Sequence, residues 1–296
     1  MEKITAKMKE IAIESLKKEE VDVIIGWRKG TLSWQTPPYM ARTIKDCEDL
    51  IFDGYALNNL SHYLLEDELA DQKVGIFLKG CDYRAYKQLL KTNRINEDQV
   101  KAWGVACPGL YSLENPEDKE EAERCQQCEY PTPEECEIII GDQEKEVKTS
   151  KDYEAVKEIE ELSPEERAKY WEEELSRCIR CYACRNVCPL CDCESCLLSS
   201  PEEEPGEDWL DRAGTYSQDF FFHSIRDFHQ TGRCIDCGEC ERVCPVNIPL
   251  RKLNLKLDKE LARLYGKIEA GEEDQEISPL LQFEEEDPDT FAEEGN

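Results

Sequence analysis

The chain has 296 residues, with 37 Lys and Arg against 67 Asp and Glu, and a formal net charge of −30. A chain this acidic repels nucleic-acid phosphates, which excludes a protein that grips a nucleic-acid backbone. No apolar run approaches the roughly 18 residues that would span a bilayer, and the start of the chain has no signal-peptide core. We therefore expect a cytoplasmic protein with no membrane span and no nucleic-acid partner. Its seventeen cysteines should bind metal or iron–sulfur clusters instead of forming disulfides.

Residues 1–141 predict an α/β domain with a small parallel or mixed sheet. Compact apolar runs mark the strands, and apolar residues at helical spacing mark the helices. The predicted strands are 21–26, 73–80, 100–106 and 137–141, and the predicted helices are 3–18, 58–65 and 82–90. Because the second and third strands enclose a helix, they should form a βαβ unit, whose strands pair in parallel.

Residues 142–177 predict a charged linker followed by a helix. The stretch up to about residue 162 is rich in Glu and Lys and reads as a solvated linker or an exposed helix. Ser163 and Glu166 form a capping box, with Pro164 at the first helical position. We therefore expect a helix from Pro164 to about Ser176.

Residues 178–268 predict a mostly helical ferredoxin domain with an inserted helix. Helical spacing indicates one helix over 220–231 and an amphipathic helix after Pro249. Residues 269–296 follow, with twelve acidic residues and no Lys or Arg, and this composition predicts a disordered tail. Its short apolar run at 279–283 leaves two interpretations open, a solubilising tail or a docking segment.

Two cysteine runs share the spacing Cys-x2-Cys-x2-Cys-x3-Cys-Pro, which is typical of bacterial ferredoxins that hold two clusters. The runs are Cys178, Cys181, Cys184 and Cys188, and Cys234, Cys237, Cys240 and Cys244. In such a run the first three thiolates ligate one 4Fe-4S cluster and the fourth ligates the other cluster. We therefore expect Cys244 to join the first three cysteines of the first run, and Cys188 those of the second. A structural zinc site would need paired Cys-x2-Cys knuckles instead of two triplets.

Three more cysteines, Cys191, Cys193 and Cys196, follow the first run directly. A plain two-cluster ferredoxin does not need them. They are either ligands of another centre, such as a fourth cluster, or small buried residues that line the first two clusters.

The first half holds a second constellation of cysteines. Cys81 and Cys107 each follow a predicted strand, and the carboxyl ends of parallel strands meet at one edge of a sheet, where α/β folds place ligand sites. Cys125 and Cys128 form a Cys-x2-Cys knuckle shortly afterwards. These four residues predict a third 4Fe-4S cluster, and zinc is the alternative that fits the same count.

The other candidate donors carry weaker signals. Cys47 and Cys136 have no paired partner and are expected to be core residues. His62, His223 and His229 are expected to be helix residues, although His229 lies five residues before Cys234 and could tune a cluster by hydrogen bonding.

Several of these motifs together resemble a known family. The motifs on which the resemblance rests are Lys79-Gly80-Cys81-Asp82-Tyr83-Arg84, Ala106-Cys107-Pro108-Gly109, the first cysteine run with its extension to Cys196, and the stretch 228–240. They are similar to the beta-subunit-like proteins of deazaflavin-coenzyme-reducing hydrogenases and formate dehydrogenases with a fused two-cluster ferredoxin domain. The resemblance covers roughly residues 20 to 255.

The resemblance implies an electron-transfer subunit of a larger anaerobic oxidoreductase. Its partners would be other subunits of a hydrogenase, formate dehydrogenase or heterodisulfide-reductase-like complex, between whose catalytic and flavin-containing modules it passes single electrons. Some members of the family bind FAD. The alternative function is therefore a flavin-binding dehydrogenase subunit that acts on a deazaflavin or nicotinamide coenzyme.

Overall fold

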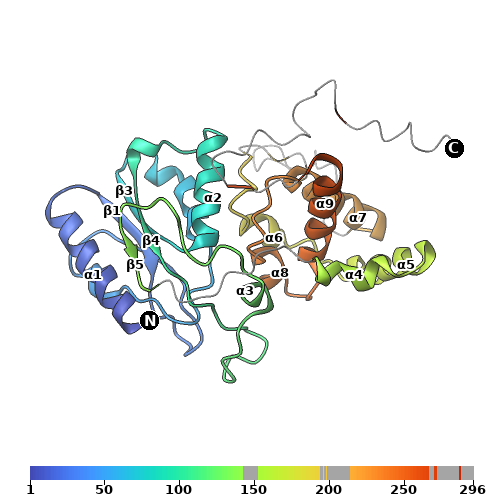
Figure 1. The fold of residues 1–296 in the computed structure, drawn as a ribbon, viewed down its shortest axis with the longest axis horizontal. Coiled ribbons are helices and arrows are strands. Elements are labelled where there is room, and N and C mark those ends of the chain that lie inside the picture. Colours follow the sequence, from blue (N-terminus) through green and yellow to red (C-terminus); the bar gives the residue numbers. More distant parts are fainter. Residues whose placement is uncertain are drawn as a thin grey trace. The chain divides into compact units, whose positions relative to one another are not determined.

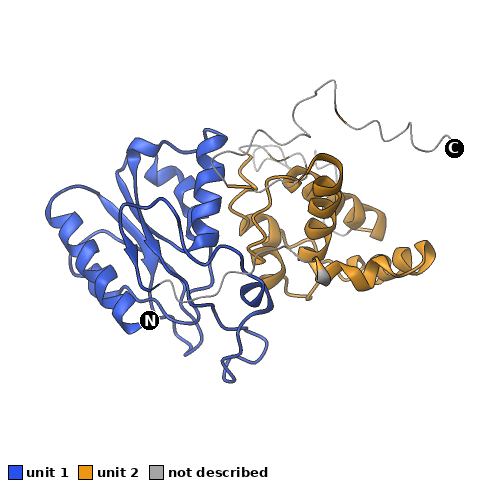
Figure 2. Ribbon diagram, in the orientation of Figure 1, with its two compact units in different colours: residues 1–151 blue, residues 152–296 orange. Residues whose placement is uncertain are grey.

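The computed structural model describes residues 1–142, 153–193, 196, 198, 214–266, 270, 271 and 287. The chain divides into two compact units, Met1–Lys151 and Asp152–Asn296 (Figure 2). The apolar run at 279–283 and nearly all of the predicted tail lie outside the described residues. Among the described helices, none combines the length and the apolar character that a membrane crossing requires.

The first unit is built on a five-stranded sheet in the order β2-β1-β3-β4-β5. The strands are β1 Val23–Trp27, β2 Pro38–Ala41, β3 Val74–Leu78, β4 Val100–Val105 and β5 Ile139–Ile140. Strands β1, β3, β4 and β5 pair in parallel, and β2 runs antiparallel to β1 at the edge. The sheet is therefore mixed, and β2 is the strand that the sequence did not predict.

Helices cover this sheet on both sides. In Figure 1, α1 and α2 flank the strands from opposite faces, and every residue of β1 and β3 is buried, as expected for a parallel sheet covered on both faces. The helices of the unit are α1 Glu2–Lys17, α2 Gly80–Lys91 and α3 Glu123–Gln126, with 3-10 turns at η1 Asp46–Asp49, η2 Leu60–Leu65, η3 Asp67–Leu69 and η4 Glu97–Gln99.

Helix α2 begins earlier than predicted. The Asp82 carboxylate accepts a hydrogen bond from the Lys79 backbone N–H at 2.9 Å, which caps the helix and places its start at Gly80 instead of residue 82. Cys81 therefore lies in the first helical turn. Since Leu78 of β3 pairs with Gly104 of β4, the segments that carry Cys81 and Cys107 leave the sheet at the same edge.

The described elements of the second unit are helices. They are α4 Glu154–Glu160, α5 Pro164–Leu175, α6 Ala183–Asn186, α7 Tyr216–Gln230, α8 Glu239–Arg242 and α9 Leu250–Tyr265. The predicted capping box is present, because Ser163 Oγ accepts from the Glu166 N–H and the Glu166 carboxylate accepts from the Ser163 N–H. Helix α7 starts four residues before its predicted position, where Thr215 and Gln218 form a second capping box.

Candidate iron–sulfur sites

The two predicted ferredoxin runs fold into equivalent loops. Arg180 and Asp236, each two residues after the first cysteine of its run, adopt left-handed backbone conformations with φ of 49° and 53°. Their N–H groups donate to the sulfur atoms of Cys178 and Cys234, both at 3.4 Å. Left-handed residues also precede α6 and α8 at matching positions. A loop that aims backbone N–H groups at its own cysteine stabilises that sulfur as a thiolate ligand.

An ion pair anchors each loop to the long helix that follows it. Arg180 is buried, and its guanidinium donates to Asp219 of α7 at 2.8 Å. In the second loop the charges are exchanged, because Asp236 accepts from Arg251 of α9 at 2.7 Å. Charge-assisted hydrogen bonds of this kind fix position strongly. The sequence analysis did not single out these four residues, which hold the cysteine loops against helices.

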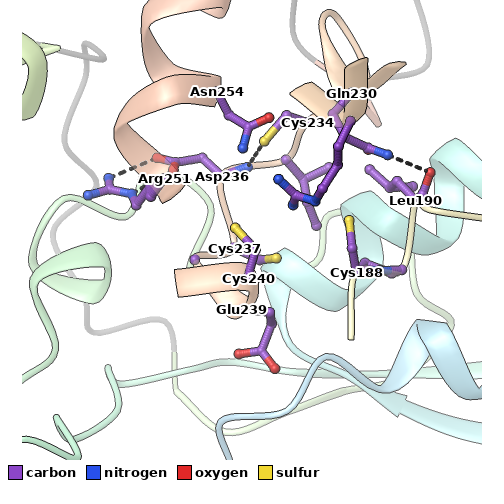
Figure 3. A pocket seen from close by; sticks show the side chains of 14 residues that line it. Cys188, Leu190, Gln230, Cys234, Asp236, Cys237, Glu239, Cys240, Arg251 and Asn254 are labelled. Carbon is purple, nitrogen blue, oxygen red and sulfur yellow. Dashed lines mark hydrogen bonds and ion pairs between the residues drawn. The ribbon is translucent and has the colours of Figure 1, made fainter. Parts of the chain in front are cut away.

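The fourth cysteine of the first run lies with the first three of the second run. One cavity is lined by Cys188 together with Cys234, Cys237 and Cys240. Figure 3 shows these four side chains around the cavity, with the Gln230 amide donating to the Leu190 carbonyl at its rim, at 3.1 Å. The structure thus brings together the set that the crossed arrangement predicts for the second cluster.

Cysteines of the other predicted set share one apolar core. Cys184 and Cys244 are buried in it, Cys178 packs against it, and Cys181 of the same loop is exposed. Burial raises the pKa of the Cys178 thiol, and the nearby charge of Cys244 adds to that effect. Cys244 Sγ also accepts from the Ile248 N–H at 3.4 Å.

A buried histidine contacts this set. His223 of α7 places Nε2 at 3.4 Å from Cys178 Sγ. Burial, together with Arg226 and Arg180, lowers the pKa of His223 to about 3, so the imidazole is neutral. When Cys178 ligates a cluster as a thiolate, which only accepts, the ring proton lies on Nε2. The sequence pointed to His229 as the tuning histidine, whereas the structure places His223 at a cysteine.

Arg226 lies among cysteines of both runs. Its Nη1 forms a buried ion pair with Asp227 Oδ1 at 2.7 Å. Burial opposes the charge of this guanidinium, but the thiols of Cys240, Cys184 and Cys188 and the Asp227 carboxylate raise its pKa above the ordinary value. A permanent cation is therefore in place beside the thiolates of both predicted clusters. In the sequence, this buried cation is indicated by polar residues spaced four, three and four positions apart on one face of α7. They are Asp219, His223, Arg226 and Gln230, and all of them are buried.

The four predicted donors of the first unit belong to segments that touch. An added Cβ on Gly80, next to Cys81, would lie 1.7 Å from the Tyr130 carbonyl oxygen, so the chain after the Cys125–Cys128 knuckle runs directly against the start of α2. The Cys107 N–H donates to the Pro131 carbonyl at 2.9 Å and ties the end of β4 to the same loop.

Electrostatic contacts link the same four thiols. The charge of Cys107 raises the pKa of Cys81, which burial already places well above its ordinary value. Burial raises the pKa of Cys107 to about 12, and Cys125 and Cys128 add to the increase. Cys81 and Cys107 are thus favoured as neutral thiols until a cation or cluster compensates the charge of their thiolates.

One buried cation lies beside this constellation. Lys79 is 1% exposed, and its Nζ lies 2.9 Å from an Asp82 carboxylate oxygen and 4.2 Å from the centre of the Trp27 ring. Its Nζ also donates to the Asn58 carbonyl at 2.9 Å. Cys81 and Cys107 are close enough to contribute to its pKa, which lies above the ordinary value although burial acts to lower it.

The remaining cysteines divide into two groups. Cys191, Cys193 and Cys196 line a separate cavity in the second unit, whereas Cys47 is buried in the core of the first unit and Cys136 packs against it. Among the residues that the structure describes, no three His, Cys, Asp or Glu side chains converge on a single metal-ion position.

Two triplet loops with an exchanged fourth cysteine define the class of dicluster ferredoxin domains. Comparison with known proteins agrees, because residues 174–248 match the family described as "4Fe-4S dicluster domain". This chain therefore carries a 4Fe-4S dicluster domain, and its cysteines fit the thiolate donor set that iron–sulfur clusters require.

The chain as a whole is similar to curated subunits of larger enzymes. It is 26% identical to the F420-dependent formate dehydrogenase subunit beta of Methanocaldococcus jannaschii, over 75% of this chain and 79% of that protein. It is 23% identical to the F420-dependent formate dehydrogenase 1 subunit beta of Methanococcus maripaludis, over 85% of this chain and 87% of that protein. The predicted resemblance to formate dehydrogenase beta subunits is thereby confirmed.

A solved structure is also similar in part. A chain of the F420-reducing NiFe hydrogenase complex from Methanosarcina barkeri is 19% identical, covers 36% of this chain and 38% of its own length, and superposes with a TM-score of 0.31. That score is too low to compare the folds.

Proposed function

We propose that this protein is the iron–sulfur electron-transfer subunit of a cytoplasmic, multi-subunit oxidoreductase of the hydrogenase, formate dehydrogenase or heterodisulfide-reductase-like type. It passes single electrons between a catalytic and a flavin-containing module. The observation that carries the proposal is the cavity that Cys188 shares with Cys234, Cys237 and Cys240, because that crossed set is the donor arrangement of a two-cluster ferredoxin. Both curated relatives, named as formate dehydrogenase beta subunits, support the class of partner.

In this proposal the eight cysteines of the two runs hold two 4Fe-4S clusters. Cys178, Cys181, Cys184 and Cys244 hold one, and Cys234, Cys237, Cys240 and Cys188 hold the other. Such a cluster accepts or donates one electron at a potential that burial, charge and hydrogen bonds to sulfur determine. The chain supplies these factors through the backbone N–H groups of Arg180 and Asp236, the His223 ring and the Arg226 guanidinium.

A third 4Fe-4S cluster, held by Cys81, Cys107, Cys125 and Cys128, belongs to the same proposal. The packing of Gly80 against Tyr130 and the hydrogen bond from Cys107 to Pro131 support it, because they join the three segments that carry these thiols. Lys79, buried beside Cys81 and Cys107, would offset the negative charge of the thiolates.

We also propose a division of the chain into four parts, with the clusters confined to two of them. These parts are the α/β domain 1–141, the linker and helix 142–177, the dicluster domain 178–268 and the acidic tail 269–296. The boundary between the two compact units, after Lys151, falls inside the proposed linker and supports this division.

Iron and acid-labile sulfide counts on anaerobically purified protein test the proposal. The double variant C125S/C128S should lose about four irons per chain, the content of one cube, with the dicluster signals unchanged. The matched control is Cys136→Ser, which removes a thiol from the same unit but from no proposed site. An unchanged iron count in the double variant would reject the third cluster.

A flavin assay separates the proposed function from its alternative. The relatives are named as beta subunits of F420-dependent formate dehydrogenases, and a flavin-binding dehydrogenase subunit is the competing class. Acid precipitation of the purified chain should release no flavin if the protein is an electron conduit. Release of stoichiometric flavin would favour the alternative.

A further inference from the structure

A cavity of about 570 Å³ in the second unit is lined by the cysteines that a two-cluster ferredoxin does not use. Cys191, Cys193 and Cys196 lie on its wall, and His229 of α7 lies on the same wall. His229 is the only other lining residue of a type that binds soft or borderline metals. Four donors from two separate segments therefore face one space.

The same wall is rich in positive charge. Arg185, Arg226 and Arg233 all line the cavity. Arg226 is 3% exposed, and the Nε atoms of Arg226 and Arg233 are buried without a hydrogen-bond acceptor among the described residues. Arg226 and Arg233 form ion pairs with Asp227 and Asp192 through other nitrogens, but a buried Nε donor without an acceptor is costly. An anionic group in the cavity, such as a cluster that carries several thiolates, would satisfy them.

The cavity adjoins the second cluster site of the dicluster domain. Leu190, Arg226 and Gln230 line both this cavity and the one that Cys188 shares with the second cysteine run. The Cys191 N–H also donates to the Cys188 carbonyl at 3.1 Å. The two spaces therefore share part of their walls.

The composition of the wall suits a cluster better than a polar ligand. Leu198 and Phe222 are almost completely buried and form its apolar part. An apolar shell of this kind limits solvent access to an iron–sulfur centre and thereby tunes it.

We propose that Cys191, Cys193, Cys196 and His229 hold a further 4Fe-4S cluster, next to the one at Cys188. The inference rests on the proposed iron–sulfur function of the dicluster domain and does not depend on the site in the first unit. The extra cluster extends the electron path from the cube at Cys188 toward the exposed Cys193 and His229. That surface is therefore a port for a redox partner.

The triple variant C191S/C193S/C196S tests the thiolate part in the full chain under anaerobic conditions. It should lose about four irons and four sulfides per chain relative to wild type, and the signals of the remaining clusters should persist. Cys136→Ser is the control and should lose none. An unchanged iron count, or loss of zinc without iron, would overturn the proposal.

Parallel variants separate this proposal from the function on which it rests. The double variant C125S/C128S removes the proposed site of the first unit. In that background the triple variant should lose the same number of irons per chain as it does alone. If wild type contains no iron at all, the proposed function fails together with this inference, whereas iron that is present but insensitive to the triple variant rejects only the inference.

The histidine ligand has its own readout, which stays decisive if the triple variant does not fold. The reduced wild-type protein, labelled with 15N-histidine, should show nitrogen hyperfine coupling to one cluster in pulsed EPR. The strong coupling of a directly bound nitrogen should vanish in His229→Ala and persist in His62→Ala and in His223→Ala, because His223 contacts only a cysteine sulfur. Absence of such coupling in wild type, or its persistence in His229→Ala, would reject His229 as a ligand.

Discussion

Cys188 and Cys240 line the same cavity although they belong to different cysteine runs and lie on different loops. Their proximity also appears in the electrostatics, because Cys188 contributes to the raised pKa of Cys240, about 11, for which burial is the main cause. In the proposed crossed arrangement, neither run can therefore complete its donor set alone.

Replacing Cys188 with Ser should damage the cluster of the second run and leave that of the first. The physical reason is that the Cys188 side chain faces the cavity of Cys234, Cys237 and Cys240. EPR spectra of the reduced protein, with iron counted per chain, should show one of the two dicluster signals converted or lost. The mirror variant Cys244→Ser should affect the other signal. Loss of the same signal in both variants would contradict the crossed arrangement.

Replacing His223 with Leu should lower the potential of the cluster at Cys178. His223 Nε2 lies 3.4 Å from Cys178 Sγ; with Cys178 as a cluster thiolate the imidazole donates, and a donor favours the more negative, reduced state of the cluster. A hydrogen bond contributes about 1 kcal/mol, which corresponds to roughly 40 mV for a one-electron couple. An EPR-monitored redox titration measures the shift. His223→Gln, which keeps a donor, should shift less, and equal potentials in all three proteins would show that the contact has no effect.

The parts of the sites that depend on local spacing could be predicted from the sequence. The Cys-x2-Cys-x2-Cys-x3-Cys spacing determines a loop within eleven residues, so both runs and their exchanged partners follow from the motif alone. The same holds for the βαβ unit, since β3, α2 and β4 carry their own apolar patterns. The predicted edge position of Cys81 and Cys107 follows from that unit.

Contacts between distant segments could not be predicted. Arg180 and Asp219 are 39 residues apart, and nothing in either neighbourhood marks the other as its partner. Strand β2 was missed because Pro38–Ala41 is a short edge strand that starts with proline. The role of His223 was missed because a histidine on a helix gives no sign of what the helix faces. Only the packing of α7 shows that its polar face is buried against cysteines.

Replacing Gly80 with Ala should remove the third cluster while the dicluster domain keeps its iron. The new Cβ would lie 1.7 Å from the Tyr130 carbonyl oxygen and 3.1 Å from the Pro131 carbonyl carbon, so the backbone of that loop must move. The loop follows Cys128 and is bonded to Cys107. Iron per chain should fall by about four, the content of one cube.

The control for this variant is Gly104→Ala in the neighbouring strand. Its Cβ would meet side-chain atoms at 3.3 Å, a distance that small side-chain shifts can relieve. We expect it to keep nearly all of its iron. Equal iron contents in Gly80→Ala and wild type would show that the close approach of the loop to α2 is not needed to hold a cluster.

Replacing Lys79 with Met should destabilise the first unit strongly. Lys79 and Asp82 are 1% and 0% exposed, so removal of the ammonium leaves a buried carboxylate without its cation. Breaking a buried pair in this way costs about 3 to 5 kcal/mol. Asp82→Asn should recover part of that loss in the double variant, because it removes the buried charge while its single amide oxygen still accepts from one of the two N–H groups, those of Lys79 and Leu60, that the carboxylate serves. A double-mutant cycle from anaerobic urea unfolding, followed by tryptophan fluorescence, gives the coupling free energy between Lys79 and Asp82.

The control is Lys101→Met, which breaks the half-exposed ion pair with Glu20 and should cost less than about 1 kcal/mol of unfolding free energy. Similar losses in Lys79→Met and Lys101→Met would show that burial of the Lys79–Asp82 pair makes no difference to the free energy of unfolding.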